Sequence, residues 1–143
     1  MTDSSQPPIG PGASSSGTAG ATTRARLAVF LLFSLDGVGF GSWAAYLPTY
    51  KTAQGLSDGG LGLVLFAVVV GSLASMPATG RVLAFRSSRN VVLAGAASFC
   101  VAIPLVTAAA MHVGAFGAFV FAALLFGATK GIIDVSANAH AIV

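Results

Sequence analysis

Charged residues are scarce in this chain of 143 residues, at 8% of the total, and glutamate is absent altogether. Hydrophobic residues make up 55%, and the mean hydropathy is +0.87. A soluble domain usually has about a quarter of its residues charged, so this chain has too few to cover its surface in water. The shortage excludes an ordinary soluble domain and indicates an integral membrane protein.

Other scarcities exclude further classes of protein. Cys100 is the single cysteine, so no disulfide can form within the chain. Lys and Arg number only seven, and all but Lys130 sit at or near the ends of apolar segments, which does not make a nucleic-acid surface. His112 and His140 have no Cys, His or carboxylate at ligand spacing. Without a nucleophile motif or a phosphate-binding loop, we expect no enzyme activity, no metal and no cofactor.

Four apolar segments are each close to the ~20 residues that cross a bilayer as a helix. They cover about 27–47, 60–84, 91–111 and 115–139. Because lipid offers no partner for backbone polar groups, each is predicted to be an α-helix. Residues 1–26 precede them, rich in small and polar residues, and are predicted to form a disordered cytoplasmic tail. The sequence therefore predicts an all-α membrane protein with its transmembrane region at 27–143.

Positive charges are unevenly shared between the two sides of these predicted helices. Five arginines fall on one side, Arg24, Arg26, Arg81, Arg86 and Arg89, whereas Lys51 alone lies on the other. Loops that stay in the cytoplasm carry the excess of Lys and Arg. We therefore expect a multi-pass protein of the cell (inner or plasma) membrane, with both ends of the chain in the cytoplasm.

Small residues recur four positions apart in three places: Gly37 and Gly41, Gly71 and Ser75, and Gly127 and Gly131. This spacing lets the backbones of two membrane helices approach closely. Each pair is therefore predicted to pack against a neighbouring helix.

Asp36 lies near the middle of the first predicted span. A carboxylate at the bilayer centre costs about 2.5–3.5 kcal/mol on insertion scales, so we expect it to face a cavity or a partner on another helix. It is a candidate proton or substrate site, with a structural hydrogen bond as the alternative. Trp43, two turns later, is expected in the aromatic belt at the membrane surface or lining the same cavity as Asp36.

The fourth predicted span carries three polar side chains. Lys130, Asp134 and Asn138 are spaced by four residues, which places them on one face of a helix. Lys130 and Asp134 can neutralise each other as an i,i+4 pair. Such a stripe is predicted to face the bundle interior or a wet cavity; alternatively, the ion pair only fixes helix contacts. With Asp36 and Trp43, these three residues are candidates for a substrate or proton pathway.

The order of helices and loops resembles the start of a major facilitator superfamily transporter. The resemblance rests on Ser42-Trp-Ala-Ala-Tyr-Leu-Pro48, on Gly55-Leu-Ser57 in a short outer loop, and on the basic loop from Gly80 to Val92. That loop occupies the place of the superfamily signature Gly-x-x-x-Asp-Arg-x-Gly-Arg-Arg, with Ala84 in place of the Asp. The resemblance implies a secondary transporter with its site between helices, without the Asp-dependent contacts of the signature.

The stretch Gly131-Ile-Ile-Asp-Val-Ser-Ala-Asn138 is similar to the acidic-x-x-x-Asn element of the fucose-permease-like branch. The resemblance implies that Asp134 takes part in proton coupling and Asn138 in contact with a sugar. Lys130 is not part of that element, and Asp36 lies further from Pro48 than the helix-one aspartate of sugar permeases does. The predicted function is transport of a small solute by proton symport, with lipid, solute and protons as partners and no nucleic acid.

Two other functions are compatible with the sequence. A four-helix multidrug exporter acting as a dimer would use a carboxylate in the first span, and a non-transporting membrane subunit would dock a partner on the polar stripe. The superfamily builds each half of a transporter from six helices, and four are predicted here. We therefore expect an N-terminal fragment that needs the remaining transporter helices, or an oligomeric partner, to function.

Overall fold

A computed structural model describes residues 15–112 and 114–141, and all regular elements within these ranges are α-helices. They are α1 (Ser15–Ala45), α2 (Leu47–Gln54), α3 (Asp58–Phe85), α4 (Ser88–Met111) and α5 (Phe116–Ala141). Four segments in this part of the chain are long and apolar enough to cross a membrane: Arg26–Gln54, Asp58–Phe85, Ser88–Met111 and Phe116–Ala139. The structure confirms the predicted all-α membrane fold.

Helix α1 begins earlier than the apolar pattern predicts. Its first residue is Ser15, so residues 15–26 are helical although the sequence predicts disorder there; residues 1–14 of that predicted tail lie outside the described residues. The last proline before the span is Pro11, so a helix formed in the apolar segment can extend backwards without losing a backbone donor. The predicted disorder is therefore wrong for residues 15–26, whereas the segment apolar enough to cross a membrane begins at Arg26, next to the predicted start at 27.

The first span does not stop at Pro48. Helix α2 starts with Pro48 in its first turn, where the missing backbone N–H has no helical partner to lose. Gly55 closes α2 in the left-handed conformation, at a φ of 63°. The Ser57 hydroxyl then accepts a hydrogen bond from the Gly60 amide at 3.2 Å and caps α3. The chain therefore turns from α2 into the next span over residues 55–57.

Helix α5 is central and packs against both α3 and α4. Small residues make its contact with α3 close, because a Cβ at Gly71 would collide with the α5 backbone and one at Gly127 with the backbone of Val68. A Cβ at Gly131 would likewise collide with the Ser75 hydroxyl. The packing predicted for these two small-residue pairs is confirmed, and such contacts hold membrane helices together where lipid supplies no hydrophobic drive.

Helix α1 packs on the bundle through a different small residue from those predicted. A Cβ at Gly37 or Gly41 would meet nothing within 4 Å, whereas one at Gly39 would lie 2.8 Å from the ring of Phe99 on α4. Within the described residues, the prediction that Gly37 and Gly41 contact a neighbouring helix is therefore wrong. Gly39 is the position that lets α1 approach α4.

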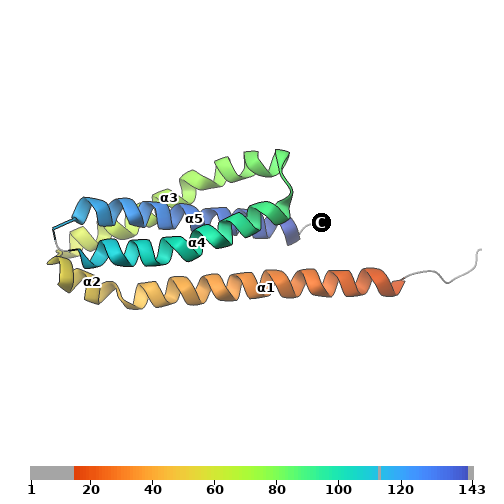
Figure 1. Cartoon of the computed structure of the whole chain (residues 1–143), viewed down its shortest axis with the longest axis horizontal. Helices are drawn as coiled ribbons and strands as arrows, with labels where there is room; N and C mark the ends of the chain where they lie inside the picture. Colours follow the sequence, from red (N-terminus) through yellow and green to blue (C-terminus); the bar gives the residue numbers. More distant parts are fainter. Residues whose placement is uncertain (1–14, 113, 142–143) are drawn as a thin grey trace, which may run out of the picture.

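The bundle has two chemically different ends. The N-terminal ends of α1 and α4 and the C-terminal ends of α3 and α5 lie at one end, and α2 lies at the other (Figure 1). Arg81, Arg86 and Arg89 cluster where α3 ends and α4 begins. We call this the arginine end. Lys51 lies in α2 at the opposite end, paired with Asp58 at the start of α3.

Helix α2 holds the opposite end together. The Tyr50 side chain is buried, and its hydroxyl lies 3.3 Å from the hydroxyl of Thr107 on α4. The Gln54 amide nitrogen donates to three carbonyl oxygens at the C-terminal end of α4, at distances of 2.8–3.2 Å. Carbonyls in the last turn of a helix have no helical donor, so Gln54 supplies the partner that α4 lacks.

Candidate functional site

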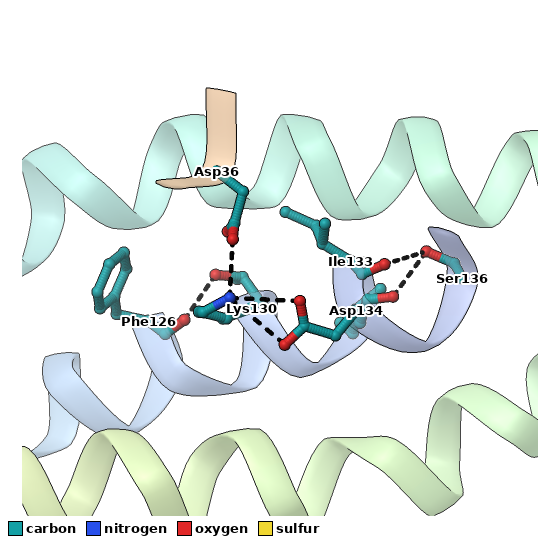
Figure 2. Close-up of polar contacts among 8 residues, drawn as sticks. Asp36, Phe126, Lys130, Ile133, Asp134 and Ser136 are labelled. Carbon is teal, nitrogen blue, oxygen red and sulfur yellow. Dashed lines mark hydrogen bonds and ion pairs between the residues drawn. The ribbon is translucent and has the colours of Figure 1, made fainter. Parts of the chain in front are cut away.

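A charged cluster joins α1 to α5 near the middle of their spans. The Lys130 ammonium donates to Asp36 Oδ2 at 2.7 Å and lies 3.3 and 3.4 Å from the two carboxylate oxygens of Asp134. Figure 2 shows Asp36 pointing from α1 toward the ammonium, with the Asp134 carboxylate beside it on α5. The structure thus brings together three of the five candidate residues, and we call them the charged triad.

Burial is uneven within the charged triad. The Asp36 side chain is 6% exposed, whereas those of Lys130 and Asp134 are 25% and 27% exposed. With all three groups ionised, two carboxylates share one ammonium, which leaves an excess of one negative charge. An uncompensated charge is costly at low dielectric. Binding of one proton to either carboxylate would remove that excess.

Aromatic rings pack beside the charged triad. Phe40 lies one turn after Asp36, and Phe126 lies one turn before Lys130; their rings stack at 6.1 Å. The Lys130 ammonium is 5.9 Å from the centre of the Phe40 ring, within the range of a cation–π contact. Sequence reasoning did not select Phe40 or Phe126, although their spacing of four from the charged residues places each on the same helix face.

Trp43 lies inside the bundle and not in an aromatic belt. Its side chain is 2% exposed, and its ring packs against Phe126 at 5.1 Å and Phe40 at 5.9 Å. The ring of Phe126 also stacks on that of Phe99 of α4, with the ring centres 5.4 Å apart. The expectation of a surface position is therefore wrong, while the alternative, that Trp43 lines the same cavity as Asp36, stays a prediction.

Two buried polar atoms on α1 have no protein hydrogen-bond partner in the described part of the chain. They are Oδ1 of Asp36, an acceptor, and Nε1 of Trp43, a donor. Buried polar groups are nearly always hydrogen-bonded, so an unpaired acceptor and donor are unusual. The two residues are seven apart, about two helical turns, with Phe40 between them. A proton or a donor group of a ligand could satisfy Asp36 Oδ1, and an acceptor group of a ligand could satisfy Trp43 Nε1.

Asn138 lies apart from this cluster. It is exposed, one turn beyond Asp134 toward the C-terminal end of α5, and takes no part in the contacts of the charged triad. The described residues contain no group of three or more His, Cys, Asp or Glu side chains that could hold a metal ion. The chemistry available at the site is thus charge pairing, proton binding and aromatic contact.

Comparison with known proteins gives two relatives. The chain is 39% identical over 113 residues to an uncharacterized MFS-type transporter of Yersinia pestis, and 31% identical over 114 residues to the membrane protein MosC of Rhizobium meliloti. The first similarity supports a relationship with the major facilitator superfamily. The alignments cover 79% and 80% of this chain but only 28% and 27% of the relatives. The chain therefore spans less than a third of their length.

No family model and no solved structure matches the chain. The similarity to this superfamily therefore rests on the Yersinia pestis relative, and it agrees with the helices that are long and apolar enough to cross a membrane. The apolar helices and the similarity to an MFS-type transporter point to a multi-pass membrane protein.

Proposed function

We propose that the chain forms the N-terminal part of a proton-coupled secondary transporter of a small polar solute such as a sugar. The observation that carries the proposal is the charged triad, in which two carboxylates from α1 and α5 share one ammonium inside the membrane. Ionisable residues within membrane spans usually mark a substrate or proton pathway. The match to little more than a quarter of a longer MFS-type transporter supports the view that further helices complete the site.

The position of the proton would determine whether the Lys130 ammonium pairs with Asp36 on α1 or with Asp134 on α5. With Asp36 ionised, its contact with Lys130 ties α1 to α5. A proton on Asp36 would remove the negative charge that attracts Lys130. Lys130 would then pair only with Asp134 on its own helix, and α1 would no longer be held to α5 by an ion pair. A proton on Asp134 would remove the competing partner and strengthen the tie. Two positions of one proton would thus favour two arrangements of α1.

The solute would bind beside the same groups. Oδ1 of Asp36 can accept a hydrogen bond, and Nε1 of Trp43 can donate one. The ring of Phe40 stacks on that of Phe126, and Phe126 also packs against Trp43. A polar solute with an apolar face fits this combination, because its hydroxyls would pair with the buried atoms and its face would lie on a ring.

The orientation follows from the arginine end. Arg81, Arg86 and Arg89 gather there, whereas Lys51 at the other end pairs with Asp58. On the positive-inside rule, we place the arginine end in the cytoplasm of the cell membrane, with both ends of the chain on that side.

Cysteine accessibility tests the proposal. Asp36→Cys and Asp134→Cys, each in a Cys100→Ser background, would be treated in membranes with a water-soluble maleimide applied from either side. We expect labelling at both positions, because a pathway for protons and solute must admit water. Val38→Cys is the matched control on α1: its side chain is 68% exposed on the apolar face, where lipid would shield it. Labelling at none of the three positions would overturn the transport proposal.

A further inference from the structure

A cavity of about 610 Å³ lies at the arginine end, away from the charged triad. It is bounded by the C-terminal part of α3, the N-terminal part of α4 and one residue of α5, Ile132. Its volume falls within the roughly 300–1,000 Å³ of small-ligand pockets. No residue of the charged triad lines it, so a ligand in this cavity would be different from the solute proposed to bind beside the triad.

The walls of this cavity offer little to a polar solute. Val82, Ala94 and Ile132 contribute apolar surface. The wall hydroxyls are already satisfied within their own helices: Thr79 donates to the Ser75 carbonyl at 2.8 Å, and Ser98 to that of Ala94 at 2.6 Å. An occupant of this part of the cavity therefore has to be largely apolar.

The end of the cavity near the α3–α4 loop is different. Arg86 and Asn90 line it there and supply a guanidinium and an amide. Every aspartate in the described ranges pairs with a lysine: Asp36 and Asp134 with Lys130, and Asp58 with Lys51 at the opposite end. Arg86 therefore has no carboxylate partner in the part of the chain that the structure describes, and an anion would complement it.

We propose that the cavity binds an anionic phospholipid. Its phosphate would be held by the Arg86 guanidinium, which can donate two parallel hydrogen bonds to phosphate oxygens, with Asn90 donating a third. One acyl chain would lie along Val82, Ala94 and Ile132. The arginine end carries the loop of a membrane hairpin, so the headgroup would sit at the membrane surface and the acyl chain would point into the bilayer. This site does not depend on transport.

Photocrosslinking in vesicles tests the site. The full chain would be placed in phosphatidylcholine vesicles containing a trace of phosphatidylglycerol with a photoactivatable acyl chain, or of phosphatidylcholine with the same chain. Crosslinked peptides would be identified by mass spectrometry. We expect phosphatidylglycerol to mark the cavity residues of α3 and α4, and phosphatidylcholine to mark them weakly. Inorganic phosphate should not compete, because a free anion lacks the acyl chain.

Two variants separate the site from general surface charge. Arg86→Gln should lower the crosslinking yield about tenfold, the effect of losing one charge-assisted hydrogen bond to the phosphate. Arg89→Gln removes the same charge from the same loop, but Arg89 does not line the cavity, so its effect should be smaller than about twofold. Ala78→Phe should displace the acyl-chain crosslinks by filling the cavity.

Three results would overturn the proposal: equal crosslinking by the two lipids, equal losses in the Arg86 and Arg89 variants, or competition by inorganic phosphate that removes the signal. Arg86 is exposed at the end of α3, so its substitution leaves the helix contacts intact. The far-UV circular dichroism of each variant would verify that the chain remains folded.

Discussion

Helix α5 contacts α3 through small residues and α1 through charged and aromatic side chains. Toward α3, α5 presents Gly127 and Gly131, and the two backbones approach so closely that an added Cβ would collide. Toward α1, it presents Lys130 and Phe126, and contact is made through an ion pair and stacked rings. The glycines and backbone atoms in contact at the first interface carry no charge, whereas the second interface depends on charge.

The difference also appears in what surrounds each interface. Many apolar side chains of α1 face outward: Leu27, Phe30, Leu31, Leu35 and Val38 are all more than half exposed. The contacts of α1 with the bundle are therefore concentrated near Asp36, Gly39 and Trp43. A packed interface of small residues keeps one arrangement, whereas under the proposed function an interface held by an ion pair would have two. Movement between the helices would therefore be confined to the interface of α1 with α5.

Breaking the ion pair gives the largest expected effect. Lys130→Met leaves the buried Asp36 carboxylate without its cation, which should lower the free energy of unfolding by about 3 kcal/mol, the low end for a broken buried pair because Lys130 is partly exposed. The measurement is a detergent-unfolding titration followed by circular dichroism. In the double variant Asp36→Leu/Lys130→Met both charges of the buried pair are gone and only the partly exposed Asp134 carboxylate remains, so stability should return to within about 1 kcal/mol of the original. A double variant as unstable as Lys130→Met would contradict the pairing.

Adding one methyl group to the packed interface should cost less. Gly127→Ala places a Cβ against the backbone of Val68, and overpacking of this kind costs about 2 kcal/mol. Gly37→Ala is the matched control, since its Cβ would meet nothing within 4 Å; it should change stability by less than about 0.5 kcal/mol. Equal effects in the same titration would show that α3 and α5 are not in backbone contact.

The α2 contact should be weaker still. Gln54→Leu removes an amide that donates to carbonyls at the end of α4, the shortest bond being 2.8 Å to His112. The expected loss is about 1 kcal/mol. Hydrogen exchange would localise it, with faster exchange in α2 and in the last turn of α4 and no change where α3 meets α5. Protection that stays unchanged in α2 would exclude this role for Gln54.

Breaking the exposed Lys51–Asp58 ion pair should have the smallest effect on stability. Lys51 pairs with Asp58 outside the core, where the Asp58 side chain is 94% exposed. Lys51→Met should change stability by less than about 0.5 kcal/mol, because solvent screens such a pair, and high salt should abolish the difference. A loss as large as that of Lys130→Met would mean that burial does not distinguish the two lysines.

The spans could be predicted because each is a local apolar run. The predicted range 60–84 compares with Asp58–Phe85, and 91–111 with Ser88–Met111. The polar residues of α5 could also be grouped, since Lys130 and Asp134 are neighbours on one turn. Residues 15–26 were not predicted to be helical, because their composition carries no apolar periodicity.

The pairing of Asp36 with Lys130 could not be predicted, since the two are 94 residues apart and nothing local indicates which helices touch. The choice among Gly37, Gly39 and Gly41 failed for the same reason: it depends on where Phe99 of α4 lies. Trp43 was expected at the surface because a tryptophan near a helix end usually lies there, but the rings of Phe40 and Phe126 bury it.

Tyr50 and Gln54 hold α2 on α4 through hydrogen bonds. The C-terminal end of α1, next to α2, is therefore the fixed end of that helix. Asp36 lies about two and a half turns before the end of α1, and the helix continues well past it toward Arg26. Breaking the Asp36–Lys130 ion pair would let the N-terminal part of α1 move, while the C-terminal part next to α2 stayed in place. Any opening gated by Asp36 should therefore be widest on the side of the membrane where Arg26 lies.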